Sequence, residues 1–444
     1  MTLTIEGVLA LAPDDASVRA ARGLASPAKW PVLGANDEAV WGECQGSGSK
    51  PYQTQVDLSG PAFRCTCPSR KFPCKHGLAL LIIQAESSDL FRTTASPAWV
   101  TEWLASRKEK AQKTQERRAE KPVALVDPEA AARRQQQRWQ RIEGAAQELE
   151  RWLADQIARG LGALNADSLE GWFTMAARLV DAQAPGLGQR VRGATWLVGG
   201  GAGWPERLLE RLGLLQLACE GLRRRESLSE ALQADLRTVV GWPHDKAEVV
   251  AQGERVTDRW TVLGVAIEER EDNLTERRVW LHGERSGRRA WLLDHAFGGR
   301  GFEQSWVSAT SLKTTLAFFP GASGLRALST EERSAVADPI WPEAKLENEW
   351  STIGDRVAAS PWVSLHPLVV PDAVVTNRGG GRLALVAANR ALPLTLGSAD
   401  SWRLLAQSGG RPLNLAGEWN GHELRPLTAW CAGAERPLWQ RSVI

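Results

Sequence analysis

The sequence contains few of the residues that build many common functional sites. Of its 444 residues, one is tyrosine, two are methionine, six are cysteine and six are histidine. No stretch approaches the run of about eighteen apolar residues that a membrane-spanning helix needs, so we expect no membrane span. The N-terminus, Met1 to Glu6, lacks a basic region and has only a short apolar run, so we expect no signal peptide. So few cysteines are typical of a protein kept in the reducing cytoplasm.

Charge is nearly balanced over the chain as a whole. There are 54 lysines and arginines against 52 aspartates and glutamates, which gives a formal net charge of +2 and a pI of about 8.2. The protein therefore has no general positive field, and any affinity for nucleic acid must come from a local patch. The 21 tryptophans are spread over the whole sequence, which favours core packing over a ligand-binding cage.

The most specific feature is a short segment that gathers thiols and an imidazole. Its pattern is C-x-C, a six-residue loop, then C-x-H, and the residues that carry it are Cys65, Cys67, Cys74 and His76. Residues two apart in an extended segment point to the same side, so the first two cysteines can reach one ion. The loop turns the chain back, and the second pair then lies at the entrance to an apolar helix.

These four side chains suit zinc, which prefers thiolate sulfur and imidazole nitrogen in a tetrahedron. Four protein ligands leave no open position for water or substrate, so we predict one structural Zn²⁺. Two other interpretations compete. Cys65 and Cys67 could form a disulfide, although its ring would be strained and a cytosolic protein would not keep it. The cysteines could also be small hydrophobic residues with no shared role.

The segment resembles the SWIM zinc finger, whose pattern is C-x-C-x(n)-C-x-H. The likeness rests on Phe-Arg-Cys-Thr-Cys-Pro at 63–68 and Pro-Cys-Lys-His-Gly-Leu-Ala at 73–79. It extends over about residues 18–90, where 40–44 and 52–56 look like the two strands that usually precede the motif. SWIM domains occur in transposases, helicase-like remodelling ATPases, ubiquitin ligases and bacterial stand-alone proteins. The whole chain is similar to the long bacterial members of this last group.

The resemblance implies recognition of DNA or of proteins. Similar bacterial proteins are often associated with AAA-type ATPases and von Willebrand A-domain proteins, which favours an assembly role by analogy. We therefore expect a non-catalytic, cytoplasmic recognition or adaptor protein, and two hypotheses stay open: nucleic-acid binding through the zinc module, and a pure protein–protein scaffold. No small-molecule substrate is evident. Asp294 and His295 are adjacent, but no motif places a nucleophile beside them, so we expect no enzyme.

Four basic residues and no acidic one lie between positions 64 and 75: Arg64, Arg70, Lys71 and Lys75. They could contact phosphates, as basic loops beside a helix start often do. They could also neutralise the zinc cluster, because Zn²⁺ with three thiolates carries one negative charge. One or two cations would suffice for neutralisation, so the excess favours an anionic partner.

Hydrophobic periodicity divides the rest of the chain. Apolar residues recur at three- and four-residue steps from Trp139 to Ile157, which predicts a buried helical face, and the period changes to two after Gly241. Asp167 with Glu170 predicts a helix cap, and the glycines at 199–203 predict a connection between helices. Residues 1–17 are expected to be loosely held. Residues 106–121 contain seven basic and three acidic residues and nothing large and apolar, which is typical of a linker or a solvated helix extension.

The predicted fold class is a multidomain α+β protein. We expect a small ββα-like zinc module at 1–95, a short helix and charged linker at 96–126, a helical domain at 127–243, an antiparallel β meander at 244–330, and a mixed α+β domain at 331–444. The last of these should include a small sheet or a partly closed barrel.

Overall fold

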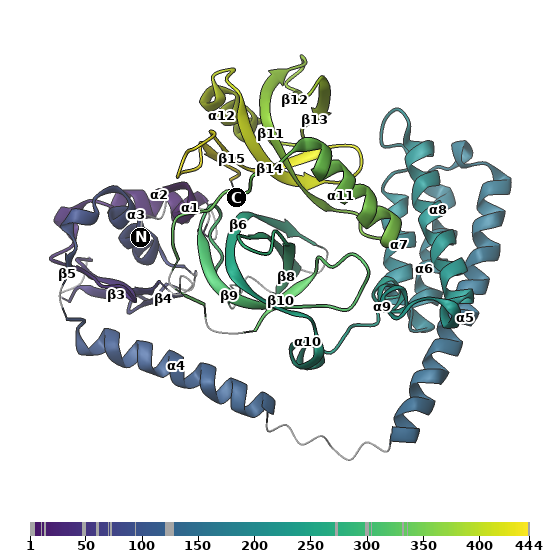
Figure 1. The fold of residues 1–444 in the computed structure, drawn as a ribbon, viewed down its shortest axis with the longest axis horizontal. Coiled ribbons are helices and arrows are strands. Elements are labelled where there is room, and N and C mark those ends of the chain that lie inside the picture. Colours follow the sequence, from purple (N-terminus) through teal and green to yellow (C-terminus); the bar gives the residue numbers. More distant parts are fainter. Residues whose placement is uncertain are drawn as a thin grey trace.

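The structure is a computed structural model that describes residues 5–9, 11–12, 15–46, 50–58, 62–69, 71, 73–93, 95–119, 128–270, 274–297, 302, 304–330, 333–334 and 336–442. The zinc module lies at one end of the molecule, a helical bundle at the other, and two β-sheets between them (Figure 1). The prediction of a mixed α+β fold is confirmed. Among the described residues, no helix combines the length and the apolar composition that a membrane span requires.

The zinc module is a five-stranded sheet in the order β4-β3-β2-β1-β5. Its elements are α1 (Ile5–Leu9), α2 (Asp15–Leu24), β1 (Val32–Ala35), β2 (Ala39–Cys44), β3 (Tyr52–Asp57), β4 (Ala62–Cys65), α3 (Lys75–Glu86) and β5 (Arg92–Thr93). The two predicted strands are β2 and β3, which pair antiparallel. Helices α1, α2 and α3 pack together on one face of the sheet, over Val40 and Val56.

Helix α4 (Ala98–Ala119) covers the opposite face. Side chains alternate along β2, so Val40 faces α3 while its neighbours Ala39 and Trp41 face α4. Trp103 and Leu104 of α4 are buried against them. The sheet is therefore buried on both sides.

Two expectations for this region differ from the structure. Residues 1–17 are not a loose lead-in throughout, because Val8 of α1 is fully buried in the core of the zinc module. The helix after the module is not short, since α4 runs on to Ala119, which agrees with the helix extension that was the alternative to a linker. Arg107 of α4 pairs with Asp57 of β3 at 2.9 Å, so a charged residue of the stretch 106–121 anchors the helix to the sheet.

Replacing Trp103 by alanine should therefore destabilise the zinc module. The indole is 8% exposed, and its loss would leave a cavity against Trp41 that typically costs about 3–5 kcal/mol. Hydrogen exchange of β2 and β3 amides measures the effect. Lys108→Ala on the same helix is the control, because its exposed pair with Glu38 contributes at most about 1 kcal/mol. Equal exchange in the two variants would show that α4 does not hold the sheet.

The helical bundle comprises α5 (Pro128–Arg159), α6 (Glu170–Asp181), α7 (Pro185–Thr195), α8 (Trp204–Arg223) and α9 (Glu230–Val239), followed by the short α10 (Lys246–Gln252). The predicted face of α5 is buried from Trp139 to Leu153, while Ile157 is 46% exposed. The capping box lies at Asn165 and Ser168, one turn before α6, and not at Asp167 and Glu170. The glycines at 199–203 connect α7 and α8, as expected.

The C-terminal half holds two antiparallel sheets. The first has the order β10-β9-β6-β7-β8 and consists of β6 (Arg255–Glu269), β7 (Leu274–Gly283), β8 (Arg289–Phe297), β9 (Ser311–Phe318) and β10 (Ala327–Ser329). The second has the order β13-β12-β11-β14-β15-β16 and consists of β11 (His366–Asn377), β12 (Leu383–Ala387), β13 (Arg390–Pro393), β14 (Leu413–Trp419), β15 (Leu424–Trp430) and β16 (Trp439–Gln440). A bridge from Leu394 to Leu424 brings the chain after β13 back to β15, so this sheet is partly closed. Helices α11 (Leu346–Ala359) and α12 (Ser398–Ser408) pack on β11.

The two sheets meet at a close backbone approach. A Cβ atom at Gly264 of β6 would lie 2.4 Å from Cβ of Leu427 in β15, so only glycine fits there. Around this point the interface is apolar and includes Trp280 and Trp430.

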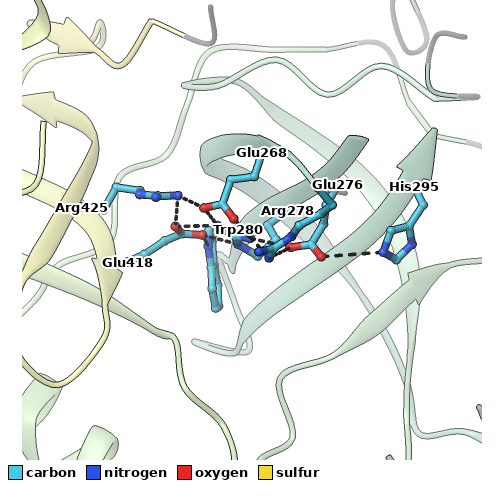
Figure 2. A network of polar contacts seen from close by, with 8 residues as sticks. Glu268, Glu276, Arg278, Trp280, His295, Glu418 and Arg425 are labelled. Atoms are coloured by element: carbon cyan, nitrogen blue, oxygen red, sulfur yellow. Dashed lines mark hydrogen bonds and ion pairs between the residues drawn. The ribbon is translucent and has the colours of Figure 1, made fainter. Parts of the chain in front are cut away.

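A buried network of charged side chains crosses the same interface (Figure 2). Arg278 of β7 is 2% exposed and donates to Glu418 of β14 at 2.8 Å, to Glu268 of β6 at 2.8 Å and to Glu276 at 2.6 Å. The indole of Trp280 also donates to Glu418, at 2.7 Å. One arginine therefore connects carboxylates from both sheets.

Contacts with the C-terminal half hold the other two parts of the molecule. Val307, in the segment between β8 and β9, packs into the core of the zinc module. In the bundle, Trp362 packs into the helical core and donates to the carbonyl of Leu214 at 3.2 Å. Asp235 of α9 accepts a hydrogen bond from the amide of Ala322 at 3.1 Å.

Candidate metal centre

The structure brings the four predicted zinc ligands together. Their ligand atoms all lie within 4.8 Å of one another, and the residues are Cys65, Cys67, Cys74 and His76. Cys65 ends β4, Cys67 lies in the loop that follows, Cys74 is the N-cap of α3 and His76 lies in the first turn of that helix. A strand end, a loop and a helix start thus converge, as the spacing predicted. Atoms this close fit around one ion with Zn–S distances of about 2.3 Å.

Hydrogen bonds hold the cluster in place. The amide of Thr66 donates to the carbonyl of Gln53 at 3.0 Å, which extends the β3–β4 ladder past Cys65. The amide of Gly77 donates to Sγ of Cys74 at 3.5 Å, and Nδ1 of His76 lies 3.7 Å from Sγ of Cys65. The ring of Tyr52 packs against the His76 ring with centroids 4.9 Å apart. These contacts fix the orientation of the side chains in the cluster.

The arrangement favours a thiolate on Cys74. The hydrogen bond with Cys65 lowers the pKa of Cys74 to about 4, and His76 and the Gly77 amide act in the same direction, while burial opposes them. The same thiol pair raises the pKa of Cys65. Because zinc binds thiolates, metal binding must release the protons that remain in the cluster.

The donor set fits zinc and a structural role. Three sulfurs and one nitrogen from the protein complete a tetrahedron and leave no position for substrate. All six cysteines of the chain are free, so Cys65 and Cys67 do not form a disulfide. Cys44 is fully buried in the core of the module, and the cluster found among the described residues does not include it.

The structure describes three of the four predicted basic contact residues. Arg64, Lys71 and Lys75 are exposed, and Arg70 lies outside the described residues. Lys71 and Lys75 line a hollow of about 800 Å³ beside the zinc cluster, between α2 and the zinc-binding loop. Lys29 lines the same hollow from the segment after α2. No acidic residue of the described part of the chain is among the residues that line it.

The sequence analysis did not predict the parts of this hollow that come from elsewhere in the chain. Lys29, Tyr52 and the wall that α2 contributes lie 13 or more residues from Cys65, and no local motif marks them. The small residues Ala16 and Ala20, four apart on α2, both line the hollow and are a sequence signal that one side of this helix leaves space.

The structure gives ordinary structural contacts to two other candidate sites from the sequence, the glycine-rich loop at 199–203 and the pair Asp294 and His295. Arg207 donates at 2.9 Å to the carbonyls of Gly200 and Ala202, so its guanidinium binds the acceptors of the glycine-rich loop. Asp294 pairs with Arg277 at 2.5 Å, while His295 lies 3.8 Å from Glu276. Adjacent strand residues thus point to different partners, and Asp294 and His295 do not form a dyad.

Comparison with protein-family models gives the class of protein. Residues 52–84 match the SWIM zinc finger, and residues 137–240 match the SWIM-associated four-helix bundle domain. The chain is thus a SWIM zinc finger protein that also carries the bundle found with such fingers. No curated protein and no solved structure matches it.

Proposed function

We propose that this protein is a non-catalytic recognition protein whose zinc module binds nucleic acid through phosphate contacts beside the zinc cluster. The observation that carries the proposal is the hollow of about 800 Å³, which Lys29, Lys71 and Lys75 line without an acidic residue among the described positions. Lysines on flexible stems are suited to phosphate contacts, which supply most of the sequence-independent affinity for nucleic acid.

The number of cations supports an anionic partner. The cluster with zinc carries one formal negative charge, which one or two cations would balance. Three lysines line the hollow, and Arg64 is exposed on β4 nearby in the sequence. The excess positive charge would be offset by phosphate groups.

Recognition of an acidic protein segment is the second candidate. The side of the hollow formed by α2 and the following turn has small or apolar side chains: Ala16, Ala20, Leu24 and Ala28. A surface that combines an apolar wall with a few cations suits a peptide as well as a nucleotide. The association with AAA-type ATPases and von Willebrand A-domain proteins, drawn from the family resemblance, belongs to this second candidate.

Nucleic-acid binding is tested by fluorescence anisotropy with labelled single- and double-stranded oligonucleotides over a range of salt concentrations. If the proposal holds, affinity falls steeply with salt, and Lys71→Ala with Lys75→Ala weakens binding and flattens the logarithmic salt slope by about one unit for each lost phosphate contact. A control variant removes two exposed lysines of the C-terminal half, Lys246 and Lys313, and should bind like the wild type.

The absence of a complex at low salt, or unchanged binding by the Lys71 and Lys75 variant, would contradict the proposal. The protein-recognition candidate then predicts a partner that stays bound in a pull-down after nuclease treatment and is lost from the same lysine variant. Because both candidates need intact thiolates in the zinc cluster, we place the protein in a reducing compartment such as the cytoplasm.

A further inference from the structure

Two arginines of the helical bundle stack on one tryptophan. Trp242 follows α9, and its ring lies 4.1 Å from the guanidinium carbon of Arg138 in α5 and 4.9 Å from that of Arg237 in α9. Burial lowers the pKa of Arg138, and the nearby positive charge of Arg237 lowers it further. The bundle thus holds two like charges together on one aromatic ring.

No carboxylate within the described residues pairs with either arginine. The Nε atoms of Arg138 and Arg237 are buried without a hydrogen-bond partner, and Arg237 donates to the carbonyl of Pro243 at 3.1 Å. A third arginine of the bundle gives a comparison. Arg225 stacks on Trp139 in the same way, at 4.6 Å, but pairs with Glu143 at 3.2 Å. Within the described residues, a carboxylate thus neutralises the arginine stacked on Trp139 but neither of the two arginines stacked on Trp242.

Two more arginines, for which the described residues provide no carboxylate partner, continue the positive charge along α5. Arg134 and Arg141 are exposed and lie at positions i−4 and i+3 from Arg138, so the three share one face of the helix. Like charges at this spacing destabilise a helix. At 1.5 Å per residue, the three span about 10 Å along the helix axis, which is enough to face several phosphates of one strand.

We propose that this arginine face, defined by Arg134, Arg138, Arg141 and Arg237, binds the phosphate backbone of a nucleic acid. Stacking on an indole leaves the edge of a guanidinium free, so its terminal Nη groups can still bind phosphate oxygens even where Nε is buried. A line of regularly spaced charges suits a polymer of regularly spaced phosphates. Helix α5, which carries three of these arginines, belongs to the bundle at the opposite end of the molecule from the zinc module (Figure 1). The arginine face deepens the proposed function by adding a second contact, and so it rests on nucleic acid being the partner.

The test uses the full-length, zinc-loaded protein and a double variant, Arg138→Gln with Arg237→Gln. Anisotropy with a labelled oligonucleotide should show an affinity loss of about tenfold or more, and the logarithmic salt slope should fall by about two units, one for each lost phosphate contact. The matched control, Arg151→Gln with Arg159→Gln, removes two exposed charges from the same helix and should change neither quantity. Arg138→Lys with Arg237→Lys keeps the charge but loses the planar fork, and should restore only part of the affinity.

Each outcome decides between the two contacts. If the Lys71 and Lys75 variant binds normally while the Arg138 and Arg237 variant is weakened, the contact at the zinc module is wrong and the arginine face stands. The reverse pattern overturns the arginine face alone. Binding of a polyglutamate peptide in place of the oligonucleotide, lost in the arginine variant, would assign the face to an acidic protein and overturn the nucleic-acid inference. Circular dichroism of each variant checks that the bundle remains folded.

Discussion

Replacing Cys74 by serine is expected to remove the zinc and unfold the zinc module. Cys74 contributes a ligand and also caps α3, whose apolar residues form the centre of the module's core. Structural zinc contributes on the order of 10 kcal/mol to small modules of this kind, which is more than their own cores supply. Metal analysis should give one zinc per wild-type chain and far less than one in the variant.

The effect should spread beyond the module. Val307 of the C-terminal half packs into the same core, so hydrogen exchange should become faster around 304–310 as well as in β2, β3 and α3. Exchange in the helical bundle, which has a separate core, should stay slow.

Cys44→Ala is the matched control for this experiment. Cys44 is buried in the module but outside the ligand cluster, so its alanine variant should keep a full equivalent of zinc. Wild-type protein with much less than one zinc per chain, or a Cys74→Ser variant that retains its zinc, would show that the assignment of these four residues as zinc ligands is wrong.

The zinc site could be predicted because its chemistry is local. All four ligands fall between Cys65 and His76, and the pairing of β3 with β4 and the start of α3 bring them together without help from distant residues. The helical bundle could likewise be predicted, since the periodicity of apolar residues from Trp139 to Leu153 indicates a buried helix face directly.

Helix α4 shows why composition alone left two interpretations of this stretch open, a linker or a helix extension. Residues 106–121 are strongly charged, but the helix is anchored by the apolar side chains before them, including Trp99, Trp103 and Leu104. Arg107 then pairs with Asp57 of β3, 50 positions away, and Lys108 pairs with Glu38 in the turn between β1 and β2, 70 positions away. Charge content does not distinguish a solvated spacer from a helix held by long-range contacts.

The buried network of Figure 2 could not be predicted for a related reason. Charged residues are almost never fully buried unless they are paired, so Arg278 is expected to be exposed from sequence alone. Its partner Glu418 is 140 positions away, and no pattern links them. The same holds for the arginines on Trp242, which come from α5 and α9.

Replacing Arg278 by methionine should destabilise the two C-terminal sheets by about 3–5 kcal/mol, because removing one partner leaves a buried charge uncompensated. Glu418 is 1% exposed and receives two of its hydrogen bonds from Arg278. Native-state hydrogen exchange of β7 and β14 amides gives the local free energy of opening. Arg270→Met is the control, since Arg270 is 44% exposed in its pair with Glu276 and should contribute at most about 1 kcal/mol.

The pH dependence gives the same network an independent test. Burial alone would raise the pKa of Glu268, but hydrogen bonds and charge from Arg278 and Arg425 lower it to about 2, against an ordinary value of 4.5. A carboxyl whose pKa is lower in the folded state stabilises the protein above the unfolded pKa and loses that contribution as pH falls through the folded one. Wild-type stability of the two sheets should therefore decline between about pH 4.5 and 2. Burial would likewise raise the pKa of Glu276, but hydrogen bonds and charge from Arg270 and Arg278 lower it, so Glu276 adds to the same decline.

The stability deficit of the Arg278→Met variant should shrink over this pH range, because protonation removes the carboxylate charges that the arginine no longer compensates. A deficit that is constant with pH would mean that Arg278 stabilises the interface by packing alone.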